Sequence, residues 1–159
     1  MSWEIEVLKE RDVEESTKAL QKSMGNQPGP LFGDAKGLGR AIYGPHAITL
    51  IAKKGGSVVG IVSGTATLPP NIAFLGVTDA DCAKEGLGGK LIDGFLDEAK
   101  KKIPNAPAVR TTLPAEYTDA VALYSSKGFV VEGFVKTAGQ GRDIVFLSRS
   151  YAQRNTSVA

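Results

Sequence analysis

The sequence predicts a mixed α/β fold, in which one sheet carries helices on its faces. Two runs rich in β-branched residues, 48–54 and 57–65, are joined through Gly55-Gly56, which is typical of an antiparallel hairpin. Beyond the hairpin, strand-like and helix-like patterns alternate along the chain. With 159 residues, of which 42% are hydrophobic, we expect one domain over 1–150 and a flexible tail over 151–159.

The region before the hairpin predicts one strand and two helices. The strand-like run covers 3–8. Asp12 and Glu15 form the pattern of a capping box, so we expect a helix to begin there, and apolar residues then recur at helical spacing. The segment 25–33 is dense in glycine and proline and predicts an irregular loop. A short helix is expected after it, ended by Gly44-Pro45.

The second half begins with a strand over 72–78, in which Gly76 predicts a bulge or a close approach by another group. A glycine-rich turn over 84–90 then opens an amphipathic helix, and the lysines 100–102 complement the dipole at its C-terminal end. The elements that follow are a strand over 108–113, a helix over 117–127, and two strands over 129–136 and 142–149 joined by a turn at 137–141.

The composition excludes several classes of function. A net charge of +2 without a dense basic block gives no reason to expect a nucleic-acid partner. No apolar run approaches the ~20 residues needed to cross a bilayer, and the N-terminus lacks the pattern of a signal peptide, so we expect a cytoplasmic protein with no membrane partner. Cys82 and His46 are the only residues of their kinds, which argues against a disulfide, a metal site and a hydrolase triad.

The turn at 84–90 is the strongest functional signal. A strand that leads into glycines at a helix start presents unpaired backbone N–H groups and the positive end of the helix dipole, which suits a diphosphate. A Walker A loop would need glycine and Ser or Thr where the chain has Lys84 and Leu91, and a dinucleotide fingerprint would need glycine at the latter position. Neither nucleotide motif is therefore present.

Two elements in the correct order resemble the GNAT superfamily of N-acetyltransferases. Gly86-Leu-Gly88 matches the G-x-G of the family's acetyl-CoA signature, and Leu123-Tyr124 with Gly128-Phe129 matches a sequence that the family carries one helix and one strand later. The resemblance covers about residues 45–150. It implies a mixed, mostly antiparallel sheet of 6–7 strands, helices on both faces and a splayed parallel pair formed by 72–78 and 108–113.

The same resemblance implies an acetyl-CoA-dependent N-acetyltransferase, in which a primary amine attacks acetyl-CoA directly in a ternary complex without a metal. Tyr124 is implied as the catalytic general acid toward the departing thiolate. The residues implied to bind the cofactor are Leu75, Gly76, Val77, Lys84, Glu85, Gly86, Leu87, Gly88, Gly89, Lys90, Tyr117 and Lys127.

The sequence departs from the family pattern at Ala83, Tyr117 and Asn71, where many members carry a Gln or Arg, an asparagine and a glutamate base. These departures motivate an alternative, a catalytically inactive CoA-binding domain that acts as a sensor or interaction module. A scaffold that does not bind CoA is a third possibility. The carboxylates considered as the base, acting through water, are those of Glu116, Asp79 and Glu132. The acceptor amine stays open between a small molecule and a peptide, and exposed edge strands suggest a homodimer.

Overall fold

A computed structural model describes residues 2–24, 35–136 and 142–151. The elements run in the order β1 (Trp3–Val7), the short 3-10 turn η1 (Glu10–Asp12), α1 (Val13–Met24), α2 (Ala35–Ile42), β2 (Ala47–Lys54), β3 (Ser57–Thr65), β4 (Asn71–Val77), α3 (Ala80–Lys84), α4 (Leu87–Lys102), β5 (Ala108–Pro114), α5 (Thr118–Ser126), β6 (Val130–Val135) and β7 (Ile144–Ser150). The loop predicted at 25–33, the turn at 137–141 and the tail beyond Tyr151 lie outside the described residues.

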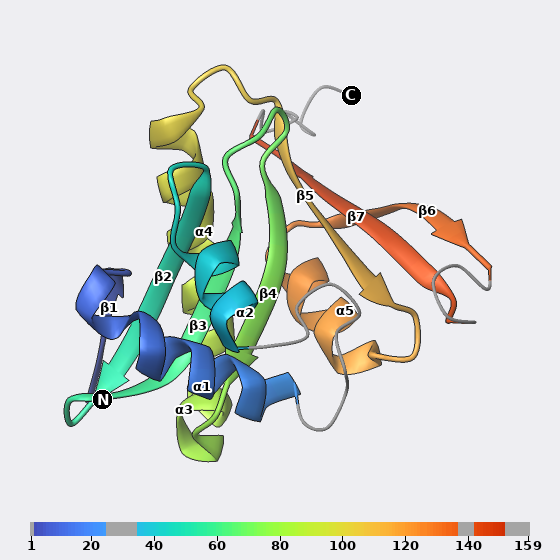
Figure 1. Ribbon diagram of the computed structural model, residues 1–159. Helices are drawn as coiled ribbons and strands as arrows, with labels where there is room; N and C mark the ends of the chain where they lie inside the picture. The colour runs from blue at the N-terminus through green and yellow to red at the C-terminus, as the bar shows by residue number, and fades with distance from the viewer. Residues whose placement is uncertain (1, 25–34, 137–141, 152–159) are drawn as a thin grey trace.

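The strands form one mixed sheet in the order β1-β2-β3-β4-β5-β7-β6 (Figure 1). Every neighbouring pair is antiparallel except β4 and β5, which are parallel. This arrangement confirms the predicted fold class. It also places the segment that precedes the glycine-rich turn in the middle of the sheet, next to the strand that leads into α5.

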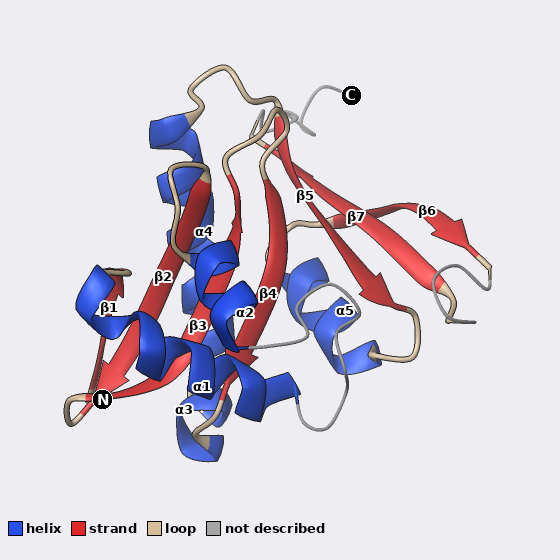
Figure 2. Ribbon diagram, in the orientation of Figure 1, coloured by secondary structure: helices blue, strands red, loops and turns tan. Residues whose placement is uncertain are grey.

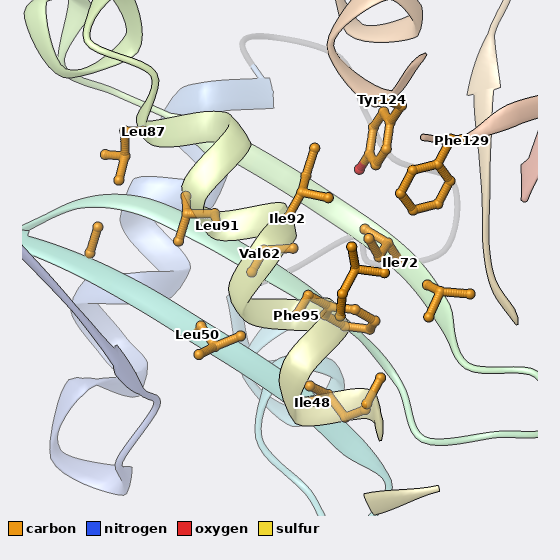
Figure 3. Packing of buried hydrophobic residues seen from close by; sticks show 14 of the residues in the cluster. Ile48, Leu50, Val62, Ile72, Leu87, Leu91, Ile92, Phe95, Tyr124 and Phe129 are labelled. Atoms are coloured by element: carbon orange, nitrogen blue, oxygen red, sulfur yellow. The ribbon is translucent and has the colours of Figure 1, made fainter. Parts of the chain in front are cut away.

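Helices cover both faces of the sheet (Figure 2). On one face, α1 and α2 pack on the first strands through a cluster that includes Leu20, Leu38 and Ile61. On the other face, α4 and α5 bury a larger cluster that includes Phe95 and Tyr124, part of which Figure 3 shows. The apolar positions of α4 recur at helical spacing, so burying one face of this helix fixes its place against β2, β3 and β4.

The parallel pair separates soon after it forms. Its register covers only Asn71 with Arg110 and Ile72 with Thr111, and beyond these residues the two strands diverge (Figure 1). On the other side of β4 the pairing with β3 continues to Val77, interrupted by a bulge at which Ala73 is the extra residue. The C-terminal half of β4 therefore has a backbone partner on one side only among the described strands.

Two local expectations were wrong, for tertiary reasons. Asp12 does not cap α1; it lies in η1, and its carboxylate accepts a hydrogen bond from Lys53 Nζ at 2.8 Å. Glu15 does not complete a capping box, because its Oε1 accepts from the backbone N–H of Val58 at 3.0 Å. Both carboxylates tie the start of α1 to the β2–β3 hairpin instead of closing the helix.

One expectation for β4 is confirmed, and one for the tail is not. The close approach predicted as one alternative at Gly76 is present, because Ser23 of α1 occupies the space that a Cβ there would need, whereas the bulge in β4 lies at Ala73. Tyr151, assigned to the flexible tail, is held by its phenol, which donates to Leu96 O at 2.8 Å, and by its N–H, which donates to Pro107 O at 3.0 Å.

Candidate active site

On the side of β4 that faces away from β3, backbone N–H and C=O groups point into the space where β4 and β5 diverge. Thr78 N–H donates to Val59 O at 2.9 Å, and the register continues with Val77 opposite Gly60 and Gly76 opposite Ile61. Antiparallel neighbours alternate between hydrogen-bonded and non-bonded pairs. Gly76 therefore bonds to β3, whereas Leu75 and Val77 direct their N–H and C=O groups toward β5, which has moved away. These groups suit an extended polar chain laid along the strand.

The glycine-rich turn presents fewer amides than its sequence suggests. Glu85 N–H donates to Asp81 O, Gly86 N–H to Ala83 O, and Lys90 N–H begins the hydrogen bonding of α4 by donating to Gly86 O. The amides of the turn that have no acceptor among the described residues are those of Leu87, Gly88 and Gly89, in the first turn of α4, and these three residues are buried. No side chain caps these amides, and Gly86 enters the helix with φ 90°, which only glycine adopts readily.

Lys127 lies across this helix end. A Cβ added to Gly89 would stand 2.7 Å from Lys127 Cε and 3.3 Å from its Nζ, so the ammonium reaches the first turn of α4. It is held there by Asp93, whose carboxylate accepts from Lys127 Nζ at 2.9 Å. A cation beside the positive end of a helix dipole is destabilising by itself. The arrangement becomes favourable when an anion binds to the cation and to the helix end together.

Tyr124 is buried on the same face, with 2% of its surface exposed. Its ring meets Phe129 edge to face at 5.1 Å between centroids, and Figure 3 shows its oxygen on the side of Ile92, away from that ring. Burial raises the pKa of the phenol well above its ordinary value of 10.0, and a hydrogen-bonding interaction with Thr111 acts in the opposite direction. The phenol therefore keeps its proton across the ordinary pH range.

Thr111 links this phenol to the point where the strands part. Its hydroxyl donates to Ile72 O at 3.0 Å, across the last register position that β4 and β5 share. Leu123, one residue before Tyr124, lies 3.0 Å from where a Cβ on Gly88 would stand. The phenol, the open end of α4 and the open side of β4 are thus brought together on one face of the sheet.

The three carboxylates considered as bases lie apart. Asp79 caps α3, and Glu116 pairs with Arg142 at 3.5 Å. Glu132 lines a cavity of about 450 Å³ together with Thr111. Glu132 therefore shares a cavity with residues of the β4–β5 junction. The signal in the sequence that could have located it is Gly133, because a glycine inside a strand often marks a bulge.

The other predicted site residues lie at the edges of this region. Lys84 ends α3 and Lys90 follows the first turn of α4, and both are exposed. Tyr117 precedes α5, and its hydroxyl accepts from Arg142 at 3.4 Å. Cys82 is buried, and burial raises the pKa of its thiol, which does not favour a nucleophile.

Asp79 holds the start of α3 through its charge. Its carboxylate accepts from Cys82 N–H at 2.9 Å and from Lys54 Nζ at 3.2 Å, which lowers its pKa from 3.8 to about 2. A lowered pKa in the folded state stabilises the protein above pH 3.8, and this contribution is lost as the pH falls toward about 2.

We expect Asp79→Asn to be less stable at neutral pH and to lose less stability over that acidic range. Chemical denaturation at several pH values measures both effects. The exposed Asp97→Asn is the control, and a variant curve parallel to that of the wild type would contradict the assignment.

No helix in the described part of the chain is long and apolar enough to span a membrane. Within the same residues, no group of three or more His, Cys, Asp or Glu side chains is arranged to hold a metal ion.

Comparison with solved structures finds similar chains among acetyltransferases. The ribosomal-protein-S18-alanine N-acetyltransferase from Escherichia coli matches with a TM-score of 0.79 at 17% identity, over 99% of both chains. A GNAT-family acetyltransferase from Streptococcus pneumoniae gives 0.76 at 20% identity, over 93% of this chain and 98% of that one. A spermidine N-acetyltransferase chimera from Vibrio cholerae and hSSAT gives 0.73 at 16% identity, over 94% and 96%.

No protein-family model matches the sequence, and no curated protein matches it either. The structural matches extend over nearly the whole length of each chain compared. At these identities they establish the arrangement of strands and helices, and they agree with the fold expected from the two sequence motifs.

Proposed function

We propose, from the premise that this chain has the fold of the GNAT acetyltransferases, that it transfers an acetyl group from acetyl-CoA to a primary amine by direct attack in a ternary complex. The observation that carries this proposal is the position of Tyr124. Its phenol lies where β4 and β5 part, on the same face as the open first turn of α4. Release of a thiolate requires a nearby group that carries a proton, and here a protonated phenol lies beside a site that suits an anion.

The residues on this face fit the donor. The amides of Leu87, Gly88 and Gly89 offer an uncapped helix end to a diphosphate, and Lys127 adds a cation beside them. Leu75 and Val77 offer unpaired backbone groups to the amide-containing arm. When bound, acetyl-CoA supplies an activated acetyl thioester. The chain then needs only to align an amine and to stabilise charge, which agrees with its lack of a His or Cys nucleophile at the site.

Tyr124 acts on the departing sulfur mainly as a hydrogen-bond donor. Burial raises the pKa of its phenol far above that of a typical thiol, about 8.5, so complete proton transfer to a thiolate is unfavourable, whereas a short hydrogen bond to it is not. The pH dependence of turnover should then come from the acceptor amine and its base. Ionisation of Tyr124 adds no decline at alkaline pH below its ordinary pKa of 10.0.

Glu132 is the carboxylate that we assign to deprotonation of the amine. It shares a cavity with Thr111, whose hydroxyl lies at the β4–β5 junction, and with Asn71, the residue at the position where some GNAT members carry glutamate. A carboxylate that approaches from β6 can perform the role that Asn71 cannot. It receives the proton of the attacking ammonium directly or through one water.

Two measurements test the proposal. Calorimetric titration with acetyl-CoA tests the donor site, and release of free thiol from acetyl-CoA in the presence of a panel of primary amines tests the transfer. Binding without amine-dependent release would favour the inactive CoA-binding alternative. Absence of binding would contradict the donor site itself.

Lys127 provides a sharper test of the donor site. We expect Lys127→Gln to weaken acetyl-CoA binding about ten- to a hundredfold, because a charge-assisted contact contributes roughly 1.5–3 kcal/mol and every 1.4 kcal/mol changes the affinity about tenfold. Lys101→Gln, which removes an exposed charge at the far end of α4, is the matched control and should leave the affinity unchanged. Equal affinities for the two variants would show that Lys127 does not contact the donor.

A further inference from the structure

The cavity that holds Glu132 lies on the face of the sheet opposite Tyr124. Val109 packs in the same cluster as Tyr124, so Arg110, the next residue on β5, points to the other face of the sheet, as does Asn71 opposite it in the register. Arg110, Asn71, Glu132 and Phe146 all line this cavity, whose volume is about 450 Å³. Among the described elements, no helix crosses this face in front of β5, β7 and β6 (Figure 1). Thr111 lines the cavity and donates to Ile72 O at the β4–β5 junction, so it connects the cavity to the donor site.

Two local features of β6 create this cavity. Val131 pairs with Leu147 and Gly133 with Phe146, so Glu132 is the extra residue of a bulge. A bulge changes the direction of a side chain, and here the Glu132 carboxylate comes within 3.7 Å of Arg110 Nε on β5, across the intervening β7. Gly133 has no side chain to cover Phe146, and that residue is 39% exposed. The cavity therefore has an aromatic wall and two opposite charges.

The two charges are only loosely paired. At 3.7 Å the contact between Arg110 Nε and Glu132 Oε2 is longer than a hydrogen bond, and the side chains are 56% and 46% exposed. An exposed pair of this kind contributes about 0–1 kcal/mol, so a ligand separates it at little cost. Both groups then have hydrogen-bonding capacity for a ligand that carries one charge of each sign close together.

We propose that the acceptor is a free α-amino acid with an apolar side chain. Its carboxylate binds the guanidinium of Arg110, its amine binds the carboxylate of Glu132, and its side chain lies on Phe146. The carboxylate and amine of an α-amino acid are joined through one carbon, which matches a cation and an anion that already lie side by side. This inference rests on the proposed acyl transfer and names the acceptor class for that site.

The lining disfavours the other acceptor classes. A polyamine would bring a second positive charge to a cavity in which Arg110 offsets Glu132. A peptide N-terminus has an amide where the free amino acid has a carboxylate, and so leaves the guanidinium of Arg110 without an anionic partner. Recognition of a charged group is the kind of selectivity that reaches large ratios, because the unmatched group in the site loses its partner.

Matched substrates test this acceptor class. L-leucine and L-phenylalanine are compared with their amides, which retain the amine and side chain and lack the carboxylate. We expect kcat/KM for the acids, calculated from the concentration of the deprotonated amine in each case, to exceed that for the amides at least tenfold. Arg110→Gln should raise KM for the acids about tenfold or more, leave KM for the amides within about twofold, and abolish the preference. Lys101→Gln is the control for loss of one positive charge.

A second variant tests the cavity wall without removing a charge. A Cβ on Gly133 would lie 3.9 Å from Phe146, an ordinary contact, so Gly133→Val is compatible with the fold and covers the ring. We expect this variant to raise KM for both amino acids and to bind acetyl-CoA with unchanged affinity in calorimetry. The acceptor assignment would be overturned if amines were acetylated with no preference for the acids. It would also be overturned if Arg110→Gln left the ratio of kcat/KM for the acids to that for the amides unchanged. Either result would leave acyl transfer intact. Failure of every amine together with failure to bind acetyl-CoA would instead reject the proposed function.

Discussion

Tyr124→Phe lowers kcat about 10²–10³-fold, the usual cost of removing one hydrogen-bond donor that stabilises developing negative charge. The phenol is the polar group at the junction of β4 and β5 that has a proton to donate to a departing sulfur, since the Thr111 hydroxyl already donates to Ile72 O. KM for acetyl-CoA should change little, because the amides of α4 and Lys127 remain. Stopped-flow or steady-state detection of free thiol measures the loss.

The matched control for this variant is Tyr151→Phe. Tyr151 also buries part of its ring and donates its phenolic proton to a carbonyl, Leu96 O at 2.8 Å, but it lies at the other end of α4. We expect this variant to lose about 1 kcal/mol of stability, as for an ordinary hydrogen bond, and to retain full turnover. Unchanged turnover in Tyr124→Phe, with Tyr151→Phe behaving as expected, would remove the phenol from the mechanism.

Gly64→Ala destabilises the protein by about 3 kcal/mol or more, at the upper end for overpacking. A Cβ at this position would overlap the carbonyl oxygen of Asn71 and approach Ile72 Cα at 2.9 Å. Both contacts are with backbone, so no rotation of a side chain relieves them. Asn71 and Ile72 also carry the parallel pairing with β5, so the strain falls on the origin of the β4–β5 divergence. Chemical denaturation measures the loss of stability.

Gly94→Ala is the contrasting variant. Its Cβ would lie 3.6 Å from Leu50 Cδ2, an ordinary contact, in the interior of α4. Because alanine favours the helix by about 1 kcal/mol over glycine, we expect this variant to be as stable as the wild type or more stable. If Gly64→Ala proved no less stable than Gly94→Ala, the close contact between β3 and the start of β4 would not exist in solution.

Much of the fold follows from local patterns in the sequence. The Gly55-Gly56 hairpin, the helix after Gly86 and the strands around it are predicted within two residues at each end, because alternating or helical spacing of apolar residues sets them. The capping box at Asp12 and Glu15 failed because both carboxylates bind partners on the hairpin, distant in the sequence. Local patterns do not identify such partners.

The candidate site was predictable in part. The two motifs located the phenol of Tyr124 and the end of α4, but the sequence could not show that α3 would use the amides of Glu85 and Gly86 for its own hydrogen bonds. The cavity proposed to bind the acceptor was less accessible to prediction, since it depends on a bulge in β6 and on Arg110 facing it from β5. A strand pattern specifies alternation and gives no register, so it does not indicate which side chains meet across a sheet.

The two sides of the divided sheet are built from almost separate sets of residues. The end of α4 and Lys127 form one set, the side chains of β5, β6 and β7 form the other, and Thr111 is the shared member. Changes in one set therefore leave the other largely undisturbed. Under the proposed assignments, selection acting on such a chain is free to replace its acceptor while it keeps its donor, and the same independence lets an engineer redesign one half at a time.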